Sequence, residues 1–216
     1  MIRAVLFDMD GLMFDTETAY SIVQTEMFKK RGVEFTVEIK RPLMGKRANE
    51  VMERIIEVWG THEKVEDVLF EQDELLKKVF QESVKKLEGL DEIIQFLVEN
   101  NVRTCIGTSS RKFLVDILLE KYNLSDMFEF VVSGDMVAKG KPDPEIYTTC
   151  VKKLNIPPSN CLVLEDSLNG VRAGVTAGCH VCAIPSEYTR DENFFIATFV
   201  VESLADKKIK DFILSN

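Results

Sequence analysis

The sequence predicts an α/β fold in which a parallel sheet carries helices on both faces and an all-α cap is inserted. Two observations predict it. From about residue 89 onward, short apolar runs alternate with amphipathic helical segments, which is the pattern of βαβ units in a parallel sheet. The first apolar run, at residues 3–7, is separated from this region by about seventy residues with apolar side chains at helical spacing and no convincing strand.

The elements follow in chain order from the hydrophobic periodicity. Residues 16–86 are predicted to be helical throughout, as the spacing of Val51, Ile55 and Val58 illustrates. After them we expect helices at 90–100, 111–122, 143–154 and 168–177, and strands at 102–107, 128–132, 161–165, 180–184 and 198–201.

This order predicts a Rossmann-like α/β core made of residues 1–15 and 87–216, with residues 16–86 as a helical cap domain. In open α/β sheets the ligand crevice lies at the carboxyl ends of the strands. Because the insert follows the first strand directly, we expect it to cover that crevice as a lid.

Composition excludes several classes of partner. With 27 Lys and Arg against 36 Asp and Glu, the net charge of −9 argues against nucleic acid and against an anionic membrane surface. The longest apolar run, residues 194–201, is too short to span a bilayer. The first strand begins so near Met1 that we expect no signal peptide, and therefore a cytoplasmic location.

The five cysteines are an odd number scattered through apolar segments, which is not the pattern of a disulfide framework. Cys179 and Cys182 have the C-x-x-C spacing of a zinc or redox site. They fall in a predicted strand, where residues three apart face opposite sides, and no second C-x-x-C pair exists. We therefore expect no structural metal at this pair.

The stretch "LFDMDGLMFD" places Asp8, Asp10 and Asp15 at and beyond the end of the first strand. Side chains two apart on a strand point the same way, so Asp8 and Asp10 are expected to face the same side. Two carboxylates held that close need a cation or a proton between them. Asp15, at the start of the helical insert, is better explained as a structural cap.

Polar side chains follow two other predicted strands: Thr108-Ser109-Ser110 after one, and Glu165-Asp166 at the end of the other, with Lys141 in the loop between. Singly, each has an ordinary structural explanation as a helix cap or a solvated loop charge. Together at one sheet edge, they predict a cation site beside a phosphate site. Oxygen ligands in a chain with two histidines favour Mg²⁺ over zinc.

The segments "DMDGLMFD", "TSS", "KGKPDPEIY" and "VLEDSLNGVRAG" resemble the motif set of the haloacid dehalogenase superfamily, in its branch of phosphatases and phosphomutases with a small helical cap. The resemblance spans the whole chain. It implies that Asp8 is the nucleophile, Asp10 the general acid and base, Lys141 a positive clamp and Thr108 a phosphate-binding hydroxyl.

The same resemblance implies a metal site formed by Asp8, the backbone carbonyl of Asp10, and Asp166, with Glu165 as a ligand or an assisting group. Further contacts to the phosphate or the substrate are predicted for a set of residues on both sides of the crevice: Met9, Tyr20, Gly45, Arg47 and Ser109.

The expected function is Mg²⁺-dependent hydrolysis of a small phosphorylated metabolite, a sugar phosphate or a nucleoside or pseudouridine 5'-phosphate, through an aspartyl-phosphate on Asp8. We expect a monomer. One alternative is a β-phosphoglucomutase-type phosphotransferase, which the resemblance disfavours because those enzymes typically carry histidine where this chain has Tyr20. An alternative of another class is a phosphoacceptor signalling module, but its accepting aspartate follows the third strand, where this chain has none in a matching setting.

Overall fold

The structure is a computed structural model that describes residues 1–43 and 46–215. Its centre is a six-stranded sheet in which every pair of neighbours is parallel, in the order β3-β2-β1-β4-β5-β6. The strands are β1 (Ala4–Phe7), β2 (Arg103–Gly107), β3 (Val131–Val132), β4 (Cys161–Glu165), β5 (His180–Ala183) and β6 (Phe199–Val200). The predicted α/β fold with a parallel sheet is confirmed.

Side chains alternate between the two faces of the sheet because successive strand residues point in opposite directions. On one face, Val5 and Phe7 pack in a core with residues of α5 (Leu90–Glu99), α6 (Lys112–Lys121) and α9 (Lys207–Ser215). On the other face, Ala4 and Leu6 pack with residues of α7 (Glu145–Leu154) and α8 (Leu168–Thr176). Helices therefore cover both faces, as the sequence predicts.

Two elements differ from the predicted ones. Of the strand expected at 128–132, regular strand geometry covers only Val131–Val132, although the Glu129 amide and the Phe130 carbonyl already form hydrogen bonds with the backbone of β2. Helix α9 was not predicted, since it buries only Ile209 and Ile213 in a lysine-rich segment. That spacing of four is the one available signal for it.

The predicted helical insert consists of α1 (Thr16–Lys30), the short α2 (Val37–Lys40), α3 (Ala48–Trp59) and α4 (Val65–Glu82), joined by turns. Helices α1 and α3 each pack on α4. Buried side chains from all three lie in one cluster that includes Val23, Met27, Met52, Ile55, Leu76 and Phe80.

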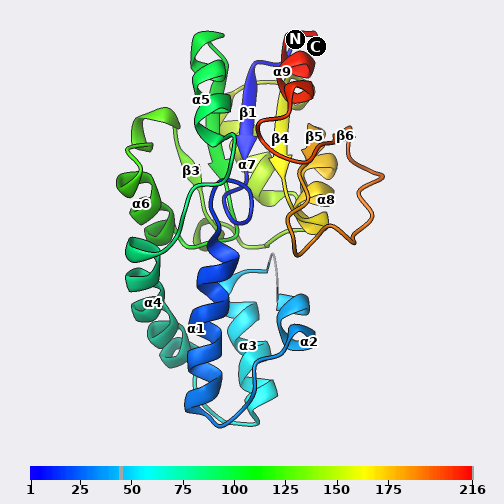
Figure 1. Ribbon diagram of the computed structural model, residues 1–216. Coiled ribbons are helices and arrows are strands. Elements are labelled where there is room, and N and C mark those ends of the chain that lie inside the picture. Colours follow the sequence, from blue (N-terminus) through cyan, green and yellow to red (C-terminus); the bar gives the residue numbers. More distant parts are fainter. Residues whose placement is uncertain (44–45, 216) are drawn as a thin grey trace.

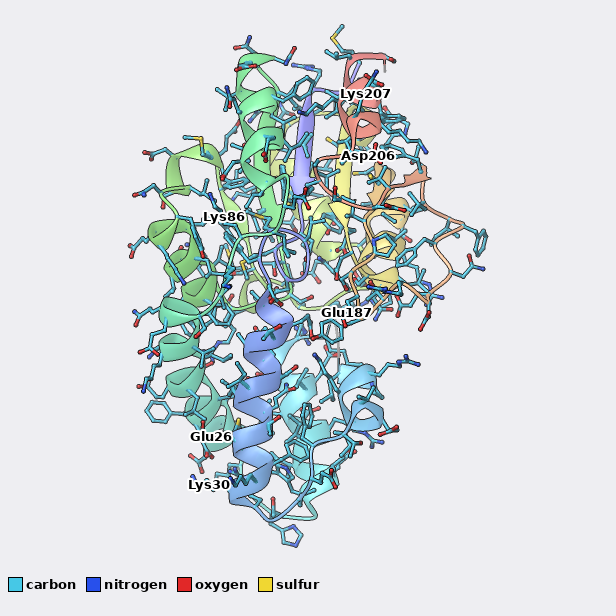
Figure 2. All side chains as sticks on the ribbon, in the orientation of Figure 1. Glu26, Lys30, Lys86, Glu187, Asp206 and Lys207 are labelled. Carbon is cyan, nitrogen blue, oxygen red and sulfur yellow. The ribbon has the colours of Figure 1, made fainter. Side chains whose placement is uncertain are left out.

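The insert lies beyond the carboxyl ends of the strands, and the two chain ends lie at the opposite end of the molecule (Figure 1). Figure 2 marks these extremes with Lys30 and Lys207, and places Glu187 at the level where the sheet edge meets the insert. The segments that enter and leave the insert lie side by side, and the Asp15 amide donates a hydrogen bond to the Lys85 carbonyl. The exact division at residues 15/16 and 86/87 stays a prediction.

Asp15 is the N-cap of α1, and its carboxylate accepts hydrogen bonds from the Thr18 amide at 3.3 Å and the Thr18 hydroxyl at 2.8 Å. Aspartate at this position satisfies a helix amide that has no partner within the helix. The capping role expected for Asp15 is thus what the structure shows.

Among the described helices, none combines the length and the apolar character needed to cross a bilayer.

Candidate active site

Adjacent strands bring the first acidic cluster together. Strands β1 and β4 pair with Phe7 opposite Leu164, so the residues that follow, Asp8 and Glu165, emerge next to each other at the carboxyl edge. One carboxylate oxygen each from Asp8, Glu165 and Asp166 lie within 4.8 Å of one another, and all three residues are buried. The chain order changes direction between these strands, which is where α/β sheets bind ligands.

Lys141 lies inside this cluster. Its ammonium is 2.5 Å from Asp8 Oδ1 and 2.6 Å from Glu165 Oε1, and it donates to the Gly107 carbonyl at 3.0 Å. Burial by itself lowers the pKa of a lysine, but here the Asp8 and Glu165 carboxylates outweigh burial and raise the pKa of Lys141. The side chain is therefore a fixed positive charge at the end of β1.

Both oxygens of Glu165 accept hydrogen bonds from protein groups. The Tyr147 hydroxyl donates to Oε1 at 2.6 Å, while the amide and hydroxyl of Ser167 donate to Oε2 at 3.2 Å and 3.1 Å. Sequence reasoning missed Tyr147, although it lies in the motif segment "KGKPDPEIY". The available signal was the helical spacing that places Tyr147 with Cys150 and Leu154 on the buried face of α7. This network holds Glu165 so that it can position Lys141.

Gly170 is predicted to be required for that network. A Cβ at Gly170 would lie 1.7 Å from Glu165 Oε1, in a first turn of α8 where helix propensity alone favours alanine by roughly 1 kcal/mol. We expect Gly170→Ala to destabilise the protein by about 2–4 kcal/mol, because it displaces a buried carboxylate from Lys141 and Tyr147. Thermal or urea unfolding measures this change, and a more stable variant would contradict the geometry.

The cluster carries excess negative charge. Burial, reinforced by repulsion from Glu165 and Asp8, raises the pKa of Asp166, and burial raises the pKa of Asp8 despite its bond to Lys141. Gly11 leaves the space that the Asp166 carboxylate occupies: its φ is +72°, and a Cβ there would lie 2.5 Å from Asp166 Oδ2. Three buried carboxylates facing one ammonium, with oxygen as the only donor type, fit a hard divalent cation such as Mg²⁺.

Asp10 has different partners from Asp8. Its Oδ2 accepts a hydrogen bond from Thr108 Oγ1 at 2.8 Å, and its Oδ1 is buried without a partner among the described residues. Burial raises the pKa of Asp10, although the nearby polar side chains of Ser110 and Thr108 act in the opposite direction. Strand β1 ends at Phe7, so alternation along a strand does not govern residue 10. The two carboxylates therefore lie in one site with separate partners.

The insert supplies the other wall. The Tyr20 and Ser110 hydroxyls are 2.9 Å apart, and the Ser110 amide donates to Thr108 Oγ1 at 3.0 Å. A cavity of about 80 Å³ lies between the insert and the strand ends, and Asp10, Tyr20 and Ser109 are among its lining residues. The structure thus brings predicted residues from both sides to one cavity.

Three predicted contacts need separate comment. The Met9 side chain is fully buried in the core, which leaves only its backbone to face a ligand. Gly45 lies outside the described residues. Arg47 was expected to contact the substrate, but its guanidinium donates to the carbonyls of Val137 at 3.1 Å and Ala138 at 2.7 Å. Arg47 is the N-cap residue of α3 and lies beside the loop that carries Lys141, which brings its guanidinium to these carbonyls. Its role as a substrate ligand stays a prediction.

Comparisons with known proteins agree with this geometry. A family model described as haloacid dehalogenase-like hydrolase matches residues 5–184. The chain is 32% identical over 177 residues to a phosphorylated carbohydrates phosphatase from Thermotoga maritima, with 82% of each chain covered. It is 30% identical over 213 residues to a probable pseudouridine-5'-phosphatase from Drosophila melanogaster, with 96% of this chain and 92% of the relative covered.

Among solved structures, the chain is similar to CbbY from Rhodobacter sphaeroides in complex with phosphate, at a TM-score of 0.86 and 29% identity, with 95% of this chain and 96% of that chain covered. The names of the two sequence relatives agree with the predicted enzyme class, a phosphoric monoester hydrolase. The family match sets aside the alternative of a phosphoacceptor signalling module. Matched over most of its length and carrying the four motif segments, the chain belongs to the haloacid dehalogenase-like hydrolases.

Proposed function

We propose that this protein is a Mg²⁺-dependent phosphatase that hydrolyses a small phosphorylated metabolite through an aspartyl-phosphate on Asp8. The observation that carries the proposal is the buried cluster in which Lys141 pairs with Asp8 and Glu165 next to Asp166, with Asp10 beside it. A carboxylate nucleophile requires neutralisation before it can approach a phosphate dianion, and this cluster provides it.

In the first step, an Asp8 oxygen forms a bond to phosphorus while the bond to the leaving oxygen breaks. Asp10 donates its proton to that oxygen, so the alcohol departs neutral. In the second step, water attacks the aspartyl-phosphate, Asp10 takes a proton from the water, and phosphate and the Asp8 carboxylate are released. Burial, which raises the pKa of Asp10, suits this exchange of one proton in both directions.

The residues that would hold Mg²⁺ are Asp8 and Asp166 through their carboxylates and Asp10 through its backbone carbonyl. A bound divalent cation supplies charge neutralisation at the phosphate oxygens. Since both Glu165 oxygens are already bound by protein donors, we propose that Glu165 assists by orienting Lys141. Lys141 and Thr108 would contact the phosphate.

The names of the two relatives suggest phosphorylated sugars or pseudouridine 5'-phosphate as substrate classes for this chain. We favour hydrolysis over phosphotransfer between sugars, because Tyr20 stands where the mutases carry histidine, and its hydroxyl is engaged by Ser110. Water then remains the acceptor of the phosphoryl group. A monomeric state and a cytoplasmic location stay predictions.

Metal dependence provides the direct test. We expect release of inorganic phosphate from acetyl phosphate to require Mg²⁺, to stop in excess EDTA, and to return when Mg²⁺ is added back. Ca²⁺ should restore little activity, because its longer bonds and looser coordination misplace nucleophile and phosphate. Full turnover in excess EDTA would overturn the proposed metal site.

A further inference from the structure

Helix α4 carries a polar side chain in a position built for an apolar one. Its buried residues are Val68, Gln72, Leu76 and Phe80, each four residues after the last, so they form a single stripe. Gln72 is 2% exposed, and its Nε2 has no hydrogen-bond partner among the described residues. A buried amide without a partner is destabilising, whereas leucine or methionine would complete the stripe.

Gln72 lines the same cavity as Asp10, the group proposed to protonate the leaving group. Gln24 of α1, which is 5% exposed, lines it as well. The unpaired Gln72 amide in a cavity that Asp10 also lines is explained if a ligand bound there supplies the missing acceptor. The ligand group in question is the part of the substrate that departs as the alcohol.

The walls of the cavity indicate the chemistry of that group. Among its described lining residues the one aromatic is Tyr20, so no second ring is available to sandwich a nucleobase. Glu17 and Lys40 also line it and pair with each other, with Lys40 Nζ 3.3 Å from Glu17 Oε2. Carboxamides beside a neutralised ion pair suit uncharged hydroxyl groups.

Resting on the proposed phosphatase function, we propose that the substrate is the monophosphate of a small uncharged polyol or sugar, and that Gln72 selects it by donating a hydrogen bond to a hydroxyl group. Nucleoside monophosphates are then poor substrates. Gln72 acts on specificity and takes no part in phosphoryl transfer.

The experiment compares kcat/KM for glycerol 3-phosphate, erythritol 4-phosphate, sorbitol 6-phosphate and pseudouridine 5'-phosphate, with acetyl phosphate as a donor that does not reach Gln72. We expect the kcat/KM of the best polyol phosphate to exceed that of pseudouridine 5'-phosphate by at least about tenfold. If pseudouridine 5'-phosphate equals or exceeds it, the inference fails.

The matched variants are Gln72→Met, which keeps the side-chain length and removes the amide, and Gln95→Met on the exposed face of α5. Gln72→Met should lower kcat/KM for the best polyol phosphate by about tenfold to a hundredfold and leave acetyl phosphate unchanged. It should melt at the same temperature as wild type or higher, because an unpaired polar atom has been removed. Gln95→Met should change neither kinetic constant.

Equal losses of kcat/KM on polyol phosphate and acetyl phosphate, or no loss on either, would overturn the role of Gln72. Gln72→Leu repeats the test if the methionine variant does not fold. Failure of the proposed function is a separate result: wild-type protein that releases no phosphate from acetyl phosphate in Mg²⁺ refutes the phosphatase, whereas turnover of acetyl phosphate without polyol preference refutes only this inference.

Discussion

Asp8→Asn is expected to abolish turnover, lowering kcat by about 10⁴-fold or more, because an amide oxygen is a poor nucleophile toward phosphorus. The side chain keeps its shape, so the site remains assembled around Lys141, which retains Glu165 at 2.6 Å. Phosphate release from acetyl phosphate, followed over many turnovers, measures the effect. Steady-state activity near that of wild type would remove Asp8 from the mechanism.

Stability separates this loss from misfolding. In metal-free protein the Asp8 carboxylate is buried among other acids, and burial raises its pKa, so its charged form is destabilised. The variant also loses the ion pair between Asp8 and Lys141, but Lys141 keeps Glu165, so we expect Asp8→Asn in EDTA to unfold cooperatively, at a temperature close to that of wild type. The control is Asp15→Asn in the same motif: asparagine also caps helices well, so its activity should stay within about twofold of wild type.

Asp10→Asn is expected to have an effect that depends on the leaving group. For an alkyl phosphate, whose alcohol must receive a proton, kcat/KM should fall by about 10²–10⁴-fold. For acetyl phosphate, whose leaving carboxylate needs no proton, kcat/KM should fall by less than about tenfold. The values of kcat/KM for a series of leaving groups of differing pKa measure this dependence.

The second step gives an independent readout. Without Asp10 as a base, the aspartyl-phosphate should accumulate, so mixing the variant with acetyl phosphate should release a burst of acetate close to one equivalent, followed by slow turnover. The hydrogen bond that Thr108 donates to Asp10 Oδ2 can persist in Asp10→Asn, because the new amide oxygen also accepts, and this keeps the geometry comparable. An equal loss of kcat/KM across leaving groups would contradict the acid role of Asp10.

Much of the candidate site could be predicted because it follows from local patterns. Apolar runs that alternate with amphipathic helices indicate a parallel sheet, and the residues after β1, β2 and β4 must then lie at one edge. Asp8, Thr108 and Glu165 were therefore placed together by their positions after strands. Gln72 was not found, because a glutamine in an amphipathic helix has no distinguishing local signal unless its whole stripe is known to be buried.

The sequence by itself determined the fold class and the sheet edge that carries the acids, since both depend on periodicity and on short-range chain connectivity. Only the tertiary structure decided the pairing: Lys141 with Asp8, 133 residues apart, Thr108 with Asp10, 98 residues apart, and Arg47 with the carbonyls of a backbone loop. Such contacts depend on where helices and loops pack across the sheet edge, because a small displacement of either partner is enough to break a hydrogen bond. No local pattern of residues encodes those distances, because they result from the packing of the whole molecule.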